Sequence, residues 1–276
     1  MTVGTDSSDG DPGRTGTLYL VPTPLDFGLR GEAAMAPQGA ADWLPRDTLA
    51  VAARLTHWIT ENARSTRAFL KRVGTETPLA APLQAQSLVE LPRQAHKKGD
   101  HAPDSVVEAA ARALLAPAVQ GHDIGLVSEA GMPAIADPGS SVVRAAHAMG
   151  VPVVPLVGPV SLMLALAASG LNGQQFAFVG YVPQETGERA RRLREMEALA
   201  LRSGQTQILI ETPYRNSALL QALLQHLQPQ TRLAVSCGLG LPAQVTRSET
   251  VRQWRKRASP AQGLTLDLPA VFLFGP

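Results

Sequence analysis

Short β-branched apolar runs alternate with longer amphipathic segments from residue 17 to the end of the chain. This alternation is typical of parallel strands joined by helices. A strand that is covered on both faces is apolar throughout, whereas the helix that covers it is apolar only on the side facing the sheet. The pattern is clearest in DIGLVS (123–128), a helical run at 140–150 and VPVVPLV (151–157), which together predict one β-α-β unit. We therefore predict an α/β protein.

The other predicted elements extend this pattern in both directions. Further strands are predicted at 17–21, 56–60, 176–182, 205–211, 231–237 and 270–274. Further helices are predicted at 46–55, 66–73 (capped by Ser65 and ended by Gly74), 105–119 (capped by Asp104), 161–170, 187–202 and 213–227. Residues 75–103 carry several prolines and no sustained period, so we expect a long, mobile connection there.

Glycine and proline positions predict how these elements divide into domains. Residues 1–16 are mostly Gly, Ser, Thr, Asp and Pro, which cannot bury enough apolar surface to become ordered, and we expect a disordered tail. Gly158-Pro159 and the stretch 170–173 bracket a helix suited to connect two domains. We expect an N-terminal α/β domain over 17–160 with a mostly parallel sheet. A smaller α/β domain with a mixed sheet is expected over 161–276.

Composition excludes several classes of protein. The chain has 276 residues, 45% of them apolar, which is enough to form a core without a disulfide or metal. Cys237 is the single cysteine, so a disulfide framework and a multi-cysteine zinc site are excluded, and its apolar surroundings predict a core thiol. No apolar run approaches the roughly 20 residues that span a bilayer, and the N-terminus lacks the pattern of a secretion signal. We expect a cytoplasmic protein without a membrane or metal partner.

Three loops follow predicted strands and are rich in Gly and Pro. They are Pro22-Thr23-Pro24, the segment from Glu129 to Pro133, and Gly158-Pro159. In an open parallel sheet, ligands bind outside the carboxyl ends of the strands, where small residues let backbone N–H groups approach them. Any one of these loops is explained by a tight turn, but three converging loops favour a preformed small-molecule site. We expect Asp137 to cap the helix after the second loop, with Pro138 and Pro159 in first helical turns.

Several common sites are missing from the sequence. It contains no G-x-G-x-x-G after the first strand, no G-x-x-x-x-G-K-[ST] and no G-x-S-x-G. An ordinary dinucleotide site, a P-loop and a hydrolase nucleophile elbow are therefore not expected.

The second loop carries a resemblance to a known family. SEAGMPAIADPG (128–139) resembles the S-D-A-G-T-P-G-I-S-D-P-G signature of the tetrapyrrole methylase superfamily, in particular its ribosomal RNA small subunit methyltransferase I branch. LYLVPTPL, TENARSTRAFL, VPLVGPVS, GYVPQETGERARRL and ETPYR resemble further segments of that branch, in the same order. The similarity extends from residue 17 to the C-terminus.

This resemblance implies a methyltransferase that binds S-adenosylmethionine in a cleft between two α/β domains, usually as a homodimer, with RNA as the acceptor. Carried onto this sequence, it assigns cofactor contacts to Pro24, Ser128, Glu129, Ala130, Gly131, Pro133, Gly158, Val160, Ser161, Glu211 and Thr212. It places Glu61, Arg64 and Arg67 toward the acceptor and Arg189 toward phosphate. A ribose 2′-hydroxyl needs a proton acceptor before it can attack, and Glu61 and Glu129 are the candidates.

The chain departs from the branch at several positions. Asn62 and Ala63 stand where the branch has acidic and hydroxyl side chains, and Glu129, Val157, Val160 and Tyr214 also differ. These changes bear on the acceptor more than on the cofactor. They leave two alternatives open: a methylase of a tetrapyrrole or another small molecule, and a non-catalytic paralogue that binds S-adenosylmethionine.

Charge gives weak independent support for an RNA acceptor. The formal net charge is only +2, so a basic surface must be local. Three groups of basic residues could supply phosphate contacts. They are Arg189, Arg191, Arg192, Arg194 and Arg202; Arg252, Arg255, Lys256 and Arg257; and Arg64, Arg67, Lys71 and Arg72. Each group is equally explained as a solvated helix face balanced by glutamates, and aromatic residues for base stacking are scarce.

Overall fold

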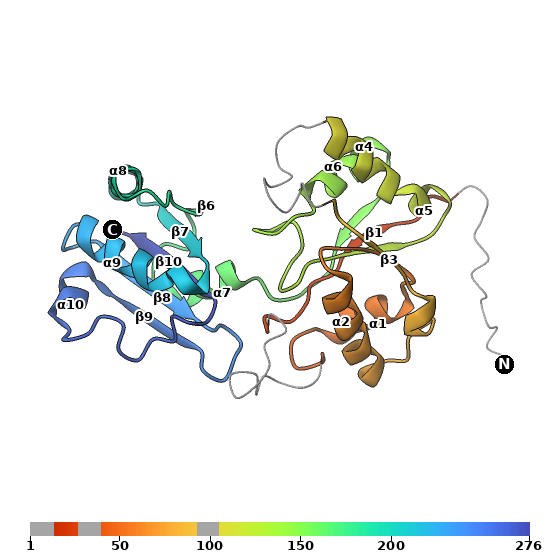
Figure 1. Ribbon diagram of the computed structural model, residues 1–276, viewed down its shortest axis with the longest axis horizontal. Helices are drawn as coiled ribbons and strands as arrows, with labels where there is room; N and C mark the ends of the chain where they lie inside the picture. The colour runs from red at the N-terminus through yellow and green to blue at the C-terminus, as the bar shows by residue number, and fades with distance from the viewer. Residues whose placement is uncertain (1–13, 27–39, 93–104) are drawn as a thin grey trace. The chain divides into compact units, whose positions relative to one another are not determined.

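The computed structural model describes residues 14–26, 40–92 and 105–276 (Figure 1). The predicted tail up to residue 13, the capping role of Asp104 and residues 93–103 of the predicted connection lie outside this part of the chain. The described residues form two compact units, one reaching to Pro159 and the other comprising Val160–Pro276.

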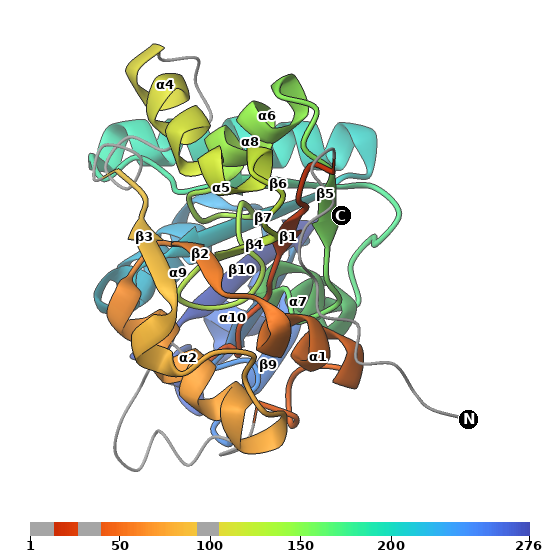
Figure 2. The same cartoon turned by 90° about the vertical axis from the view of Figure 1, so that its right-hand side faces the viewer.

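The first unit contains a five-stranded sheet. Its strands are β1 (Leu18–Leu20), β2 (His57–Thr60), β3 (Ser87–Glu90), β4 (Ile124–Val127) and β5 (Val153–Pro155). Figure 2 shows them in the order β3-β2-β4-β1-β5, and every neighbouring pair is parallel. The parallel sheet predicted from the apolar runs is therefore confirmed.

Helices cover both faces of this sheet. They are α1 (Arg46–Arg54), α2 (Ala63–Glu76), α4 (Ser105–Leu114), α5 (Ala116–Val119) and α6 (Ser140–Ala148), with a 3₁₀ turn η2 (Leu83–Ala85). Alternate strand residues point to opposite faces. Leu18 and Leu126 share a core with α4, α5 and α6, whereas Trp58 and Val127 share one with α1 and α2 (Figure 1). The unit is a three-layer α/β structure.

Three predictions about the first unit are wrong in detail. The segment predicted as an irregular connection contains β3, an edge strand with mostly exposed side chains and hence no apolar run. Helix α2 is capped by Asn62 and not by Ser65, since the Asn62 side chain accepts hydrogen bonds from the backbone of Arg64 (2.9 Å) and Ser65 (3.4 Å). The helix also continues through Gly74 to Glu76.

The helix predicted at 105–119 is divided at Leu115. Pro117 lies in the first turn of α5 and has no N–H with which to continue the hydrogen bonding of α4. The sequence therefore contained the signal for this break.

The second unit contains a mixed sheet, as expected. Its strands are β6 (Phe176–Gly180), β7 (Thr206–Glu211), β8 (Arg232–Cys237), β9 (Val245–Thr250) and β10 (Ala270–Gly275), in the order β6-β7-β10-β8-β9. Only β6 and β7 are parallel. Strand β9 was not predicted, because its sequence VTRSET is mainly polar and all its residues are half-buried.

The helices of the second unit also lie on both faces of its sheet. They are α7 (Ser161–Ser169), α8 (Thr186–Ser203), α9 (Asn216–His226) and α10 (Val251–Lys256), with a 3₁₀ turn η3 (Pro213–Arg215). Leu162 and Leu166 of α7 pack against one face, and Leu193 and Leu223 of α8 and α9 belong to the core on the other. Cys237 is fully buried in that second core, where desolvation raises its pKa to about 11, so it is the core thiol that was predicted.

Candidate functional site

The loops after β1 and β4 are joined by their backbones. The Thr23 N–H donates to the Gly131 carbonyl (2.9 Å), and the Gly131 N–H donates to the Thr23 carbonyl (3.0 Å). The Thr23 hydroxyl also donates to the Ser128 carbonyl (3.3 Å). The chain leaves β1 toward β2 and leaves β4 toward β5, on opposite sides of this pair of strands. The joined loops therefore lie at the switch point of the sheet, where open α/β sheets bind ligands.

The loop after β5 packs against the loop after β1. A Cβ atom on Gly158 would lie 2.2 Å from the ring of Pro22, so only glycine allows this approach. Gly131 has a φ of +80°, and a Cβ there would lie 3.1 Å from Leu25. The structure thus brings together the three loops that the sequence singled out. Pro159 does not enter a helix as predicted, since α7 begins at Ser161 with Val160 as its cap.

The loop after β2 adds polar groups to this edge of the sheet. The backbone N–H of Glu129 donates to the carboxylate of Glu61 (3.1 Å), and the side-chain amide of Asn62 donates to Oε1 of Glu129 (2.9 Å). The N–H of Glu61 donates to the Val127 carbonyl (3.2 Å). The two predicted proton acceptors, Glu61 and Glu129, are therefore direct neighbours.

Asp137 is a third carboxyl group at this edge, and its predicted role as a helix cap is wrong. Helix α6 begins at Ser140, and its cap is Gly139, with a φ of +138°. Burial, together with the charges of Glu61 and Glu129, raises the pKa of Asp137 to about 7, although a hydrogen bond with Ser128 lowers it. A carboxyl group with this pKa can hold or release a proton near neutral pH.

The backbone that carries Asp137 is strained. Ala134 and Ala136 both have positive φ angles, 64° and 65°, which side chains other than glycine adopt at a cost. Sequence reasoning missed Asp137 as a functional residue because Asp followed by Pro is also a normal start for a helix. The available signal was the presence of two carboxylates, Glu129 and Asp137, in one Gly-rich loop.

The remaining predicted residues of the first unit lie around these loops. Pro24, Ser128, Gly131 and Pro133 are buried, whereas Glu129 is exposed. Ala130 and Gly158 are half-buried. Arg64 and Arg67 are exposed on the first turns of α2.

Glu211 and Thr212 lie at the carboxyl end of β7 in the second unit. Oε1 of Glu211 accepts hydrogen bonds from Nε of Arg215 (3.0 Å), from Nη2 of Arg215 (2.8 Å) and from the Thr212 N–H (2.8 Å). The Glu211 side chain is 6% exposed. This carboxylate therefore holds the turn after β7 in one conformation.

Members of all three predicted basic groups are used within the fold: Arg72 pairs with Asp26, and Nε of Arg194 donates to the Ala190 carbonyl (3.1 Å). Arg255 donates to the carbonyls of Leu224 (2.7 Å) and Leu227 (2.8 Å) at the end of α9, and Arg257 pairs with Glu249. At the start of α8, which carries Arg189, the backbone N–H groups of Gly187 and Glu188 donate to the Glu185 carboxylate and are not available to a phosphate. These contacts weaken the argument for phosphate binding at α8 and α10.

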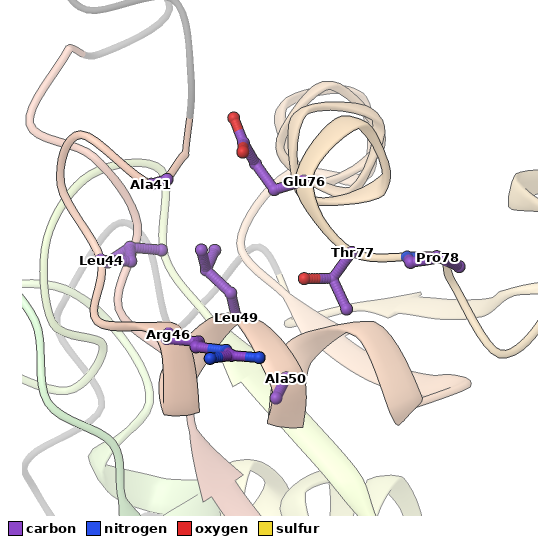
Figure 3. Close-up of a pocket in the computed structure, with 8 residues that line it drawn as sticks. All are labelled: Ala41, Leu44, Arg46, Leu49, Ala50, Glu76, Thr77 and Pro78. Carbon is purple, nitrogen blue, oxygen red and sulfur yellow. The ribbon is translucent and has the colours of Figure 1, made fainter.

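A separate hollow of about 530 Å³ lies beside α1 and the end of α2 (Figure 3). It is lined by Ala41, Leu44, Arg46, Leu49, Ala50, Glu76, Thr77 and Pro78. None of the residues assigned to the cofactor or the acceptor lines it.

Within the described residues, no three His, Cys, Asp or Glu side chains are placed to hold a metal ion. No helix in the described ranges combines the length and apolar character needed to cross a membrane.

A parallel α/β unit with joined loops at its switch point, followed by a unit with a mixed sheet, defines a two-domain α/β methyltransferase fold. The chain belongs to the family of Tetrapyrrole (Corrin/Porphyrin) Methylases, whose model matches residues 38–254. The resemblance found in the sequence is thereby confirmed.

Curated relatives support the same branch. Ribosomal RNA small subunit methyltransferase I of Mesorhizobium japonicum is 30% identical over 239 residues, which cover 85% of this chain and 67% of the relative. The protein of the same name from Xylella fastidiosa is 34% identical over 181 residues, which cover 66% of this chain and 54% of the relative. The matches thus span about half to two thirds of the length of these relatives.

Solved structures share the fold. The methyltransferase CobJ superposes with a TM-score of 0.54 at 18% identity, covering 95% of this chain and 94% of its own. Uroporphyrin-III-C-methyltransferase from Thermus thermophilus superposes with a TM-score of 0.50 at 20% identity, covering 94% of each chain. At these identities the likeness concerns the fold alone.

Proposed function

We propose that this protein is an S-adenosylmethionine-dependent methyltransferase that acts on RNA, at a ribose 2′-hydroxyl of small-subunit ribosomal RNA, in the cytoplasm. The observation that carries the proposal is the match to relatives named ribosomal RNA small subunit methyltransferase I. A protein of the same fold, uroporphyrin-III C-methyl transferase from Thermus thermophilus, is described in complex with S-adenyl homocysteine.

The chemistry of the joined loops fits this cofactor. S-adenosylmethionine carries a positive sulfonium and an ammonium group, and Glu61, Glu129 and Asp137 provide negative charge at the switch point. Gly131 and Gly158 allow the three loops to pack closely against one another, which holds these groups in place. Pro24, Ala130 and Pro133 would complete the wall in this unit, with Val160, Ser161, Glu211 and Thr212 as the proposed contacts from the second. When bound, the cofactor supplies a methyl group that is already activated.

The main task of the protein is then to align the acceptor and to remove its proton. Glu61 accepts the N–H of Glu129, and Glu129 accepts the side-chain amide of Asn62, so both carboxylates already hold the loops together. Asp137 has a pKa of about 7, which matches a proton acceptor working near neutral pH. We therefore add Asp137 to Glu61 and Glu129 as a candidate base and favour it.

Cofactor binding is tested by calorimetric titration with S-adenosylmethionine and S-adenosylhomocysteine. Gly131→Arg should abolish binding, because the side chain projects from the bridge between the loops. Gly150→Arg is the matched control, since Gly150 also has a positive φ (69°) but nothing lies within 4 Å of its Cβ position. Absence of binding by the folded wild-type protein contradicts the proposed function.

The acceptor is tested by transfer of a labelled methyl group. Incorporation into small-subunit ribosomal RNA supports the proposal. Incorporation into uroporphyrin instead supports the tetrapyrrole alternative, and normal cofactor binding without transfer to either supports the non-catalytic one.

We also propose a homodimer, on the basis of apolar surface in the second unit. Met163 and Leu164 of α7 and Phe176 and Phe178 of β6 each have more than a third of their surface exposed. Phe178 is paired with Ile208, so it lies on the sheet face against which α7 packs. Light scattering should give twice the mass of the chain, and Phe178→Arg should lower it to that of one chain. A wild-type protein that is monomeric at high concentration contradicts the dimer.

A further inference from the structure

The most exposed of the large apolar side chains in the described residues is an aromatic one at a candidate site. Tyr214 is 81% exposed. It lies in the turn η3, directly after Glu211 and Thr212, where the related branch has a histidine. Most of the tyrosine ring is therefore open to solvent and available to a ligand.

The turn holds this ring in a defined position. Glu211 anchors Arg215 through Nε and Nη2, and the Arg215 guanidinium lies 5.4 Å from the centre of the Tyr214 ring. Pro213 restricts the backbone on the other side of the tyrosine. The ring is therefore pre-positioned, which reduces the entropy lost when a flat group stacks on its open face.

A second exposed tyrosine lies at the same edge of the sheet. Tyr181 follows β6 directly and is 58% exposed. Strands β6 and β7 are parallel neighbours, and Gly180 pairs with Leu209, so Tyr181 lies level with the last residues of β7. The carboxyl ends of these two strands thus carry two exposed tyrosines, and one of them, Tyr214, lies against a fixed arginine.

This composition fits an unpaired nucleobase better than a phosphate group. Proteins recognise single-stranded RNA by stacking bases on aromatic rings and arginine planes. In contrast, Glu185 occupies the backbone N–H groups at the nearby start of α8, and it stays ionised because those hydrogen bonds lower its pKa. A phosphate at that helix end would meet a carboxylate.

We propose that Tyr214 is a specificity-determining residue on which an unpaired base of the RNA acceptor stacks, supported from below by Arg215 and flanked by Tyr181. This inference rests on the RNA acceptor proposed above and assigns to it a single-stranded segment. It also gives a role to one of the positions at which the chain departs from the related branch.

The test measures binding of a short fluorescein-labelled single-stranded RNA by anisotropy, with S-adenosylhomocysteine present. Tyr214→Ala should weaken this binding by about 5- to 100-fold, the range found when a stacking ring is removed. Tyr214→Phe keeps the ring and should bind like the wild type. Leu199→Ala, which removes an exposed apolar side chain (41%) from the same unit, is the matched control and should have no effect.

Two further measurements separate this inference from the proposed function. When the RNA is annealed to its complement, the wild type and Tyr214→Ala should bind it with the same affinity. Calorimetry should also give the same cofactor affinity for both proteins. Equal binding of single-stranded RNA by the wild type and Tyr214→Ala overturns the inference while leaving the methyltransferase intact. Loss of uroporphyrin binding, and not of RNA binding, in Tyr214→Ala also overturns it. A wild type that binds RNA but no cofactor overturns the proposed function alone.

Discussion

The carboxyl group of Asp137 shows how one residue acquires chemistry from its neighbours. Its type and position were visible in the sequence, but an Asp followed by Pro is equally well explained as the start of a helix. The proposed role of Asp137 as a proton acceptor depends on its burial and on the charge of Glu61, which both raise its pKa. Glu61 lies 76 positions earlier in the chain and is brought close by the pairing of β2 with β4. Long-range electrostatics of this kind cannot be predicted from local pattern.

Asp137→Asn should change how stability depends on pH. The folded pKa of about 7 is above the ordinary value of 3.8, so the stabilising effect of the protonated group is complete below pH 4 and is lost as the pH rises through 7. The loss is at most about 4 kcal/mol, since one pKa unit corresponds to about 1.4 kcal/mol. Urea unfolding at several pH values should show a smaller loss for the variant. Glu76→Gln, at an exposed position, should behave as the wild type.

The same substitution tests the chemistry. Single-turnover methyl transfer by the wild type should rise with a midpoint near pH 7, because Asp137 accepts a proton only when it is ionised. Asp137→Asn should be slower by about 10²- to 10⁴-fold, the usual contribution of a general base, with unchanged cofactor affinity. An unchanged rate and pH profile would return the role to Glu61 or Glu129.

Elements were predictable where their apolar pattern was strong. β4 and α6 were found because buried apolar residues mark them, and the edge strand β5 was found because its sequence is apolar although its side chains are half-buried or exposed. The edge strands β3 and β9 lack such a run, since SLVE and VTRSET mix apolar with polar side chains. The start of α2 was predicted three residues late, because Ser65 is also a good cap and Asn62 was noted only as a departure from the related branch. Its side chain in fact caps the helix and contacts Glu129.

Asn62→Ala should therefore destabilise the protein by about 1 kcal/mol, the usual cost of losing a helix cap. Asn62→Asp keeps the capping oxygen but loses the amide that Glu129 accepts, so it should keep most of the stability. Urea midpoints of the two variants give the comparison. Equal midpoints for Asn62→Ala and wild type would show that the cap contributes nothing.

Strand pairing at β4 makes a second prediction for an element. Gly125 lies between Tyr19 and Trp58 in the sheet, and a Cβ on it would lie 2.4 Å from the Trp58 ring. Gly125→Ala should lower the free energy of unfolding by about 1–3 kcal/mol through overpacking. Gly173→Ala, where nothing lies within 4 Å, should change it little. Thermal unfolding of both variants makes the comparison.

At the scale of the whole molecule, the sequence was sufficient to predict the family and the two sheets, and both predictions are confirmed. The exact limits of the domains have not been tested and stay a prediction. Motif order along the chain was enough for the family, because the signatures span both units. The roles of individual residues were less accessible. Arg215 forms an ion pair with Glu211, and Arg255 donates to backbone carbonyls. Neither interaction could be predicted from the composition of the chain.

Residues 160–276 should fold when expressed alone. Two core clusters, including Trp254, Phe272 and Phe274 in one and Ile208 and Leu273 in the other, lie entirely within this segment. We expect a cooperative thermal transition by circular dichroism and no measurable cofactor binding. A segment without a transition would contradict the predicted boundary.

The bridge between Thr23 and Gly131 uses backbone atoms for both of its hydrogen bonds. Side chains around it can therefore be exchanged during evolution without loosening the connection, provided that the close approach at Gly131 is kept. A substitution at Asn62 or Glu129, next to these loops in the first unit, should therefore alter the charge beside the bridge without separating the two loops.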